Sequence, residues 1–144
     1  MSGVMPYATG IALAALSGLV TTLAGFDRDR ALYPTLLIVI ASYYVLFAAM
    51  GGSVHALIVE SIAMSVFVGI AIVGFRSSLW LIVAALAGHG AFDFVHGLLV
   101  SNPGVPDWWP AFCLAYDVFL AGFLALLLRR RAFPADELEP ASVG

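Results

Sequence analysis

Lysine is absent from this chain of 144 residues, and charge and cysteine are scarce. Only 10% of the residues are charged, whereas a soluble domain is typically about one quarter charged. The single cysteine, Cys113, excludes an internal disulfide bond. All 6 basic residues are arginines, too few for a nucleic-acid-binding surface. These absences exclude a typical soluble domain, a disulfide-stabilised domain and a nucleic-acid-binding protein.

Apolar residues are in excess, because 62% of the chain is hydrophobic. A membrane-spanning helix needs about 20 such residues, and five runs reach that length: 7–26, 32–50, 54–75, 79–100 and 111–128. We predict an all-α integral membrane bundle of five transmembrane helices in one domain, residues 1–131. Residues 132–144 are acidic and rich in Pro and Ala, which predicts a disordered cytoplasmic tail. We expect the protein in the bacterial inner membrane.

Small residues recur at every fourth position of the first run, at Gly10, Ala14, Gly18 and Thr22. Such a stripe allows two transmembrane helices to approach closely. We therefore predict that this face of the first helix packs against another helix.

The arginines favour one orientation of the bundle. If the five runs cross the membrane in alternation, every arginine falls on the same side: Arg28, Arg30, Arg76, Arg129, Arg130 and Arg131. The positive-inside rule predicts that this side is cytoplasmic, with the N-terminus outside and the C-terminus inside. A helix rises about 1.5 Å per residue, so polar side chains of four helices then share the outer half: Tyr43, Tyr44, His55, Glu60, Asp93, His96, Cys113 and Asp117, with His89 near the midplane.

The fourth run contains three ionisable residues on one face. His89, Asp93 and His96 stand at positions i, i+4 and i+7, which fall within roughly a 60° arc of an α-helix. A charge at the bilayer centre costs from about 2.5 kcal/mol upward. We therefore expect these side chains to face protein, water or a metal ion, and not lipid.

Imidazole and carboxylate groups on one helix face suit Zn²⁺ or another first-row divalent ion. We predict that His89, Asp93, His96 and Asp117 are metal ligands, with zinc first and iron second. Asp117 and Glu60 are also the candidate catalytic groups, either of which could act as a base on a water bound to the metal. We expect the pocket to open to the outer face or laterally to the outer leaflet.

Other readings of these residues stay open. Three histidines are too few for the di-iron sites of membrane desaturases, and a bis-histidine haem would need His55 as its second ligand. Without a metal, the same acids and imidazoles could transfer protons, either to a lipid-like substrate or across the membrane.

Polar side chains can also simply join transmembrane helices, and each such contact contributes about 0.6 to 2 kcal/mol to their association. Cys113 precedes Asp117 by one turn and either lines the pocket or packs as a small apolar residue.

The block His89-x-x-x-Asp93-x-x-His96, followed by Asn102-Pro103, Pro106 and Cys113-x-x-x-Asp117, resembles a family of small uncharacterised polytopic membrane proteins. That family also has a glutamate in an earlier helix, which matches Glu60. It has tryptophan where this chain has Phe92 and a second histidine where this chain has Gly97. The resemblance covers roughly residues 50–125 and implies a shared intramembrane site, but it names no reaction. More distantly, the site resembles the zinc-dependent membrane hydrolases of the alkaline ceramidase and adiponectin receptor kind, whose His-x-x-x-His pair is absent here.

We therefore expect a membrane-embedded metal-dependent enzyme, with hydrolysis as the favoured reaction, acting on a lipid or another apolar substrate. The first alternative is a small transport or binding protein for an ion, a proton or a metal. The second is an accessory subunit of a larger membrane complex that binds a pigment or cofactor. The expected partners are membrane lipids and either further copies of the chain or a larger complex. A transporter needs polar residues inward of the midplane, and the sequence has few there.

Overall fold

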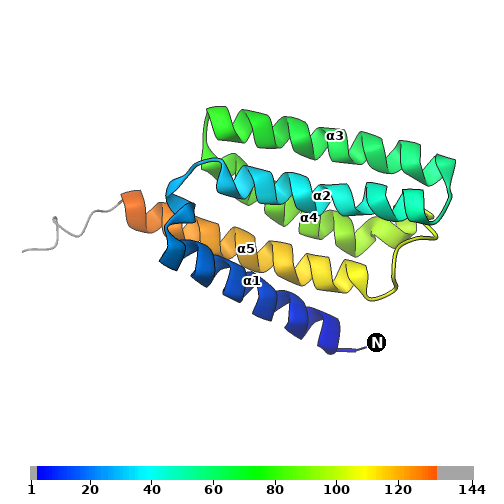
Figure 1. Cartoon of the computed structure of the whole chain (residues 1–144), viewed down its shortest axis with the longest axis horizontal. Helices are drawn as coiled ribbons and strands as arrows, with labels where there is room; N and C mark the ends of the chain where they lie inside the picture. The colour runs from blue at the N-terminus through cyan, green and yellow to red at the C-terminus, as the bar shows by residue number, and fades with distance from the viewer. Residues whose placement is uncertain (1–2, 133–144) are drawn as a thin grey trace, which may run out of the picture.

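The computed structural model describes residues 3–132 and consists of five long helices with short connections (Figure 1). The elements are α1 (Met5–Ala24), η1, a short 3-10 helix (Phe26–Arg28), α2 (Leu32–Met50), α3 (Val54–Arg76), α4 (Leu79–Leu99) and α5 (Trp109–Ala132). Residues 3–132 contain no strand. All five α-helices are long and apolar enough to cross a membrane. The prediction of an all-α bundle of five such helices is therefore confirmed.

The helices extend slightly beyond the apolar runs at the start of α1, at the end of α3 and at both ends of α5. α1 begins at Met5, with Pro6 in its first turn, where the missing N–H costs nothing. α5 continues through Arg129–Arg131 to Ala132, because arginine is a good helix former and a cation near a helix C-terminus is favourable. The arginines thus end the apolar run and not the helix. The predicted tail spans residues 132–144, and all of it after Ala132 lies outside the described residues.

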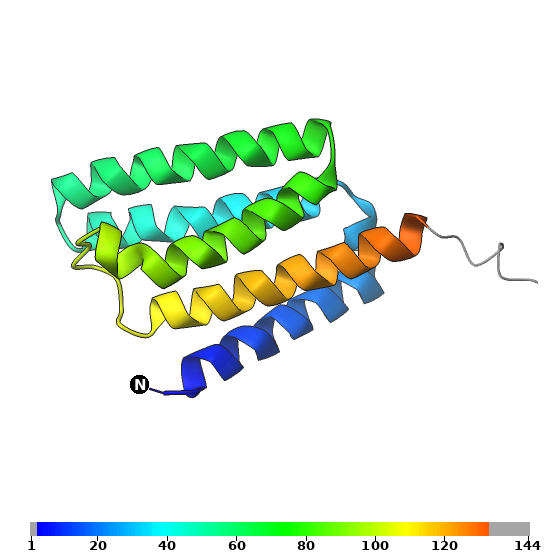
Figure 2. The ribbon, with the colours of Figure 1, turned by 180° about the vertical axis from the view of Figure 1, so that it is seen from behind.

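α4 lies in the middle of the packing. It contacts α5 on one side and α3 on the other, and it also contacts α2. α1 packs against α5 at one flank of the bundle, and α3 lies at the opposite flank beside α2 and α4 (Figures 1 and 2). Side chains on the buried face of α4 can therefore meet groups from three other helices.

The small-residue stripe of α1 is its packing face, as predicted. Gly10, Ala14 and Gly18 are buried, whereas Thr22, the last member of the predicted stripe, is exposed near the end of α1. A Cβ atom on Gly10 would overlap the carbonyl oxygen of Phe112, and one on Gly18 would contact the ring of Phe123 at 2.9 Å. The two glycines therefore let α1 lie directly against α5.

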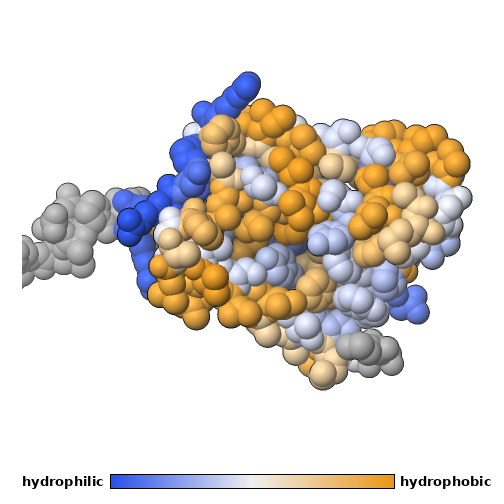
Figure 3. Space-filling model, viewed as in Figure 1, coloured by the Kyte–Doolittle hydropathy of each residue, from blue (hydrophilic) through white to orange (hydrophobic). Residues whose placement is uncertain are grey.

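The arginines gather at one end of the bundle, which we call the arginine end, while apolar residues cover much of the sides (Figure 3). The Arg30 guanidinium donates hydrogen bonds to the carbonyl oxygens of Phe75 and Ser77, at 3.1 Å and 3.3 Å, at the α3–α4 turn. Arg131 donates to the carbonyl oxygen of Asp27 at 2.8 Å and lies 3.3 Å from its carboxylate. These contacts fasten the connection between η1 and α2 to the α3–α4 turn, and α5 to η1.

The opposite end has no arginine or lysine within residues 3–132, and we call it the arginine-free end. Here the connection between α4 and α5 folds onto the α2–α3 turn. The Asn102 amide donates to the carbonyl oxygen of Tyr44 at 3.0 Å, and Gly104 lies against the backbone of Phe47 and Gly51. A Cβ atom on Gly104 would overlap the Phe47 carbonyl oxygen. Close backbone contact thus holds this connection over the end of the bundle.

Gly104→Ala is expected to lower the free energy of unfolding by about 1–3 kcal/mol, because the added methyl group displaces the connection from α2. Thermal unfolding in detergent, followed by circular dichroism, measures the change. The matched control is Gly88→Ala on α4, where a Cβ atom meets nothing within 4 Å and alanine favours the helix by about 0.5–1 kcal/mol. Equal stability of the two variants would contradict the close contact at Gly104.

Candidate metal centre

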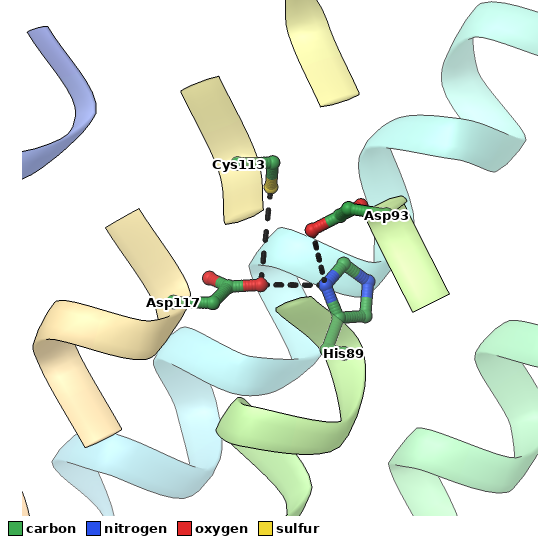
Figure 4. A group of neighbouring side chains, drawn as sticks. All are labelled: His89, Asp93, Cys113 and Asp117. Atoms are coloured by element: carbon green, nitrogen blue, oxygen red, sulfur yellow. Dashed lines mark hydrogen bonds and ion pairs between the residues drawn. The ribbon is translucent and has the colours of Figure 1, made fainter. Parts of the chain in front are cut away.

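Four ionisable side chains converge where α4 packs against α5 (Figure 4). His89 and Asp93 come from α4, and Cys113 and Asp117 come from α5. Each pair is spaced i, i+4, which places both members on one helix face. One ligand atom from each of the four residues lies within 4.8 Å of the others, and the exposed fractions are 0% to 2%. We call these four residues the α4–α5 cluster.

The imidazole of His89 lies between the two carboxylates of the α4–α5 cluster. Its Nδ1 atom is 2.6 Å from Oδ2 of Asp117 and 3.4 Å from Oδ2 of Asp93. The Cys113 thiol is 4.0 Å from the same Asp117 oxygen. Two buried carboxylate oxygens make no hydrogen bond: Oδ1 of Asp117, and Oδ2 of Asp93 despite its 3.4 Å approach to His89. An unpartnered buried acceptor costs about 1–3 kcal/mol, and a cation between the carboxylates would remove that cost.

The donor set fits a divalent ion of the zinc and iron class. Nitrogen, oxygen and sulfur ligands bind Zn²⁺ at about 2.0–2.3 Å, so ligand atoms on a tetrahedral ion are roughly 3.4 Å apart. The His89–Asp93 separation of 3.4 Å matches this value. The His89–Asp117 separation of 2.6 Å is a direct hydrogen bond, so Asp117 must turn its carboxylate before both residues can bind one ion. The cluster thus fits a metal ion but does not select which one.

His96 and Glu60 form a separate pair. Nε2 of His96 lies 2.7 Å from Oε1 of Glu60, which also accepts a hydrogen bond of 2.9 Å from the Asn102 amide. Oε2 of Glu60 is buried and has no partner. His96 shares the buried face of α4 with His89 and Asp93, but the structure places it beside α3, and the other two beside α5. The residues predicted as one ligand set therefore lie in two groups.

Tyr44 of α2 lies between these two groups. Its hydroxyl donates to Oδ1 of Asp93 at 2.6 Å. Its ring stacks on the His96 ring, with the centroids 4.0 Å apart and the planes at 16°. Tyr44 thereby holds the Asp93 carboxylate in place, which is how a hydrogen-bonded neighbour orients a metal ligand.

Two of the residues around the site had little signal in the sequence. The two adjacent tyrosines of α2 point to different faces, and only the structure shows that Tyr44 is the buried one. Asn102 stands in a Pro- and Gly-containing connection and in the block that carries the family resemblance, but neither feature indicates that its amide contacts Glu60. Cys113, for which packing and pocket lining were both open, belongs to the α4–α5 cluster. His55 is exposed in the first turn of α3 and belongs to neither group.

Two hollows lead toward the site. The first is a lateral groove between α2 and α5, about 330 Å³ in volume, whose wall includes Cys113. The second is a pocket of about 270 Å³ at the arginine-free end, whose wall includes His96 and Asn102. The α4–α5 cluster thus adjoins a lateral groove, and the His96–Glu60 pair adjoins a pocket at the end of the bundle.

Tyr44→Phe is expected to lower the free energy of unfolding by about 1–3 kcal/mol, because Asp93 loses the hydroxyl donor and its buried oxygen is left without a partner. The midpoint of thermal unfolding in detergent measures the effect. Tyr43→Phe is the matched control, since the Tyr43 hydroxyl makes no hydrogen bond within residues 3–132. A destabilisation of the same size in both variants would show that the Tyr44–Asp93 hydrogen bond contributes nothing specific.

Comparisons of the chain with protein-family models, with curated proteins and with solved structures found no match. The resemblance carried by His89, Asp93, His96, Cys113 and Asp117 therefore stays a prediction. The chemistry of this site rests on its own residues: a buried cluster of His, Cys and two Asp that could hold a metal ion inside a bundle of five apolar helices.

Proposed function

We propose that this protein is a membrane-embedded, metal-dependent enzyme that hydrolyses a lipid or another apolar substrate. One observation carries the proposal: Cys113 belongs to the α4–α5 cluster and also to the wall of the lateral groove. A substrate lying in the groove would therefore reach the candidate metal ligands without leaving the apolar phase. Zinc is the first candidate for the ion and iron the second.

A bound divalent ion supplies Lewis-acid chemistry, which polarises a carbonyl group and activates water. In this proposal His89, Asp93 and Cys113 bind the ion, and Tyr44 orients Asp93 through its hydroxyl. Asp117, whose Oδ1 atom is buried without a partner, serves as a fourth ligand or as the base that removes a proton from water. His96 is not a ligand in this arrangement.

Glu60 and His96 have a different role in the proposal. They lie near the pocket at the arginine-free end, and Oε2 of Glu60 has no partner. We assign to this pair the acceptance of the proton that the carboxylic acid product loses when it ionises. We also place the arginine end in the cytoplasm, following the positive-inside rule, so that the site lies in the outer half of the membrane.

A transport protein is the second candidate, and the direct hydrogen bond between His89 and Asp117 favours it, since such bonds conduct protons. The interior toward the arginine end argues against a complete pathway. It is filled by fully buried apolar side chains, namely Leu37, Ile82, Leu86, Leu120 and Leu124. Within residues 3–132, the one buried carboxylate beyond this layer is Asp27, which pairs with Arg131, and the buried hydroxyl of Tyr33 makes no hydrogen bond. We therefore rank the enzyme first.

Elemental analysis of the protein, purified in detergent without chelators, measures whether each chain binds a metal ion. We expect about one ion per chain in the wild type and little or none in His89→Ala, because even the loss of a group that only orients a ligand lowers metal affinity by about 10–100-fold. Asp117→Ala is expected to lose the ion if Asp117 is the fourth ligand and to keep it if Asp117 is the base. His96→Ala is expected to retain the metal, because His96 contacts Glu60 and not the α4–α5 cluster.

His55→Ala is the control, because His55 is an exposed histidine outside both groups. Metal that is absent from the wild type, or that survives in His89→Ala, would overturn the proposed function. Loss of the metal in His96→Ala but not in His55→Ala would restore His96 as a ligand and contradict the division of the site into two groups.

A further inference from the structure

We propose that the lateral groove binds a single acyl chain of an amphiphile with an uncharged head group, and that it places the ester or amide linkage of that molecule beside Cys113. This inference rests on the proposed function, because it names the substrate class of the same site. Its four supports are the size of the groove, its direction, the depth of Cys113 and the distribution of charge.

The size of the groove fits one chain. Its volume of about 330 Å³ is at the lower end of the range of about 300–1,000 Å³ for ligand pockets. Its walls are apolar and aromatic: Leu36, Val39, Ile40 and Tyr43 from α2, and Trp109, Phe112, Cys113 and Tyr116 from α5. Such walls suit a hydrocarbon chain, and the volume leaves no room for a second one.

The two ends of the groove differ: one lies toward the arginine-free end of the bundle, and the other lies deeper among apolar side chains. Tyr43 and Trp109 contact each other across its arginine-free end, with ring centroids 4.9 Å apart, and Phe47 packs on Trp109 at 4.9 Å. Tyrosine and tryptophan prefer the level of the lipid head groups. Leu36 of α2 lies two helical turns closer to the arginine end than Tyr43. An amphiphile therefore lies with its head group near Trp109 and its chain toward the midplane.

Cys113 is one helical turn deeper than Trp109, or about 6 Å along α5. The linkage that joins a lipid head group to its acyl chain lies just below the head group, and so it meets the thiol and the α4–α5 cluster behind it. Hydrolysis consumes one water molecule. The water oxygen bonds to the carbonyl carbon, the bond from that carbon to the ester oxygen or amide nitrogen breaks, and a proton passes to the leaving atom. The products are a carboxylic acid and an alcohol or amine.

Charge excludes an anionic head group. Within residues 3–132, no arginine or lysine lies at the arginine-free end. The carboxylates there include the exposed Asp107 on the connection to α5 and the buried Glu60. A phosphate at this end would find no arginine or lysine within residues 3–132, and Asp107, in the wall of the neighbouring end pocket, would repel it. Hydroxyl or amide head groups meet neither obstacle.

The sole cysteine of the chain provides a direct readout. The experiment measures the rate at which N-ethylmaleimide alkylates Cys113 in chelator-treated, detergent-solubilised protein, so that a bound metal does not shield the thiol. Monodecanoylglycerol is the neutral probe. Its phosphate derivative, with the same chain and linkage, is the anionic probe, and decane is the probe without a head group.

We expect monodecanoylglycerol to slow alkylation about tenfold when its concentration is about ten times its dissociation constant, and the other two probes to have much weaker effects. Val39→Trp fills the groove from its partly exposed side and is expected to remove this protection. Ile38→Trp is the matched control, because the neighbouring residue lines a different hollow, between α2 and α3, and it is expected to retain the protection.

Equal protection by the anionic probe or by decane would overturn the assignment of a neutral head group. No protection by any probe, protection that survives Val39→Trp, or a wild-type thiol that does not react at all would overturn the groove as the binding site. The metal content, measured on the same preparation before chelation, separates this inference from the proposed function. Metal without protection refutes the inference alone, and protection without metal refutes the function alone.

Discussion

An ionisable side chain inside a bilayer must find its partner within the protein, because neither water nor lipid can solvate it. Five such side chains are almost completely buried here: Glu60, His89, Asp93, His96 and Asp117. Three of them project from α4, which contacts α2, α3 and α5. Partners come from each of those helices, namely Tyr44, Glu60 and Asp117. The position of α4 in the middle of the bundle follows from this requirement.

The hydrogen bonding of the buried acids is incomplete in both groups. The His96–Glu60 pair is braced by stacking on Tyr44 and by the Asn102 amide, although Oε2 of Glu60 has no partner. In the α4–α5 cluster, one imidazole lies beside two carboxylates. Oδ1 of Asp117 has no partner there, and Oδ2 of Asp93 has only the 3.4 Å approach to that imidazole. A single Asp–His hydrogen bond would be enough to join the two helices. The surplus of carboxylate oxygens over hydrogen-bond donors is the property expected of a site that receives a cation or a proton.

The site is also one-sided. The two groups of buried acids and histidines and the end pocket lie on the arginine-free side of an apolar plug that includes Leu86, Leu120 and Leu124, and the lateral groove runs from that side along the plug to Leu36. A transport pathway through the centre of the bundle would have to cross that plug. Beside the plug the described residues offer only part-buried hydroxyl groups, such as the Tyr116 hydroxyl that donates to Ser17 at 3.2 Å, and no buried acid or imidazole. Access from the lipid side at Cys113 and from the end of the bundle at His96 suits a reaction between an apolar molecule and water. The two reactants would then approach the site from different directions.

Local features of the sequence determined the five apolar helices, the gathering of all arginines at one end and the common face of His89, Asp93 and His96. These follow from composition and from a helical rotation of about 100° per residue, which act within one segment. Periodicity does not say which neighbouring helix meets a given face. Only the tertiary structure decided that His96 pairs with Glu60 while His89 and Asp93 meet Cys113 and Asp117, because that division depends on how α3 and α5 pack on opposite sides of α4. The same holds for Tyr44 and Asn102, whose contacts join segments 49 and 42 residues apart in the chain and so depend on long-range packing.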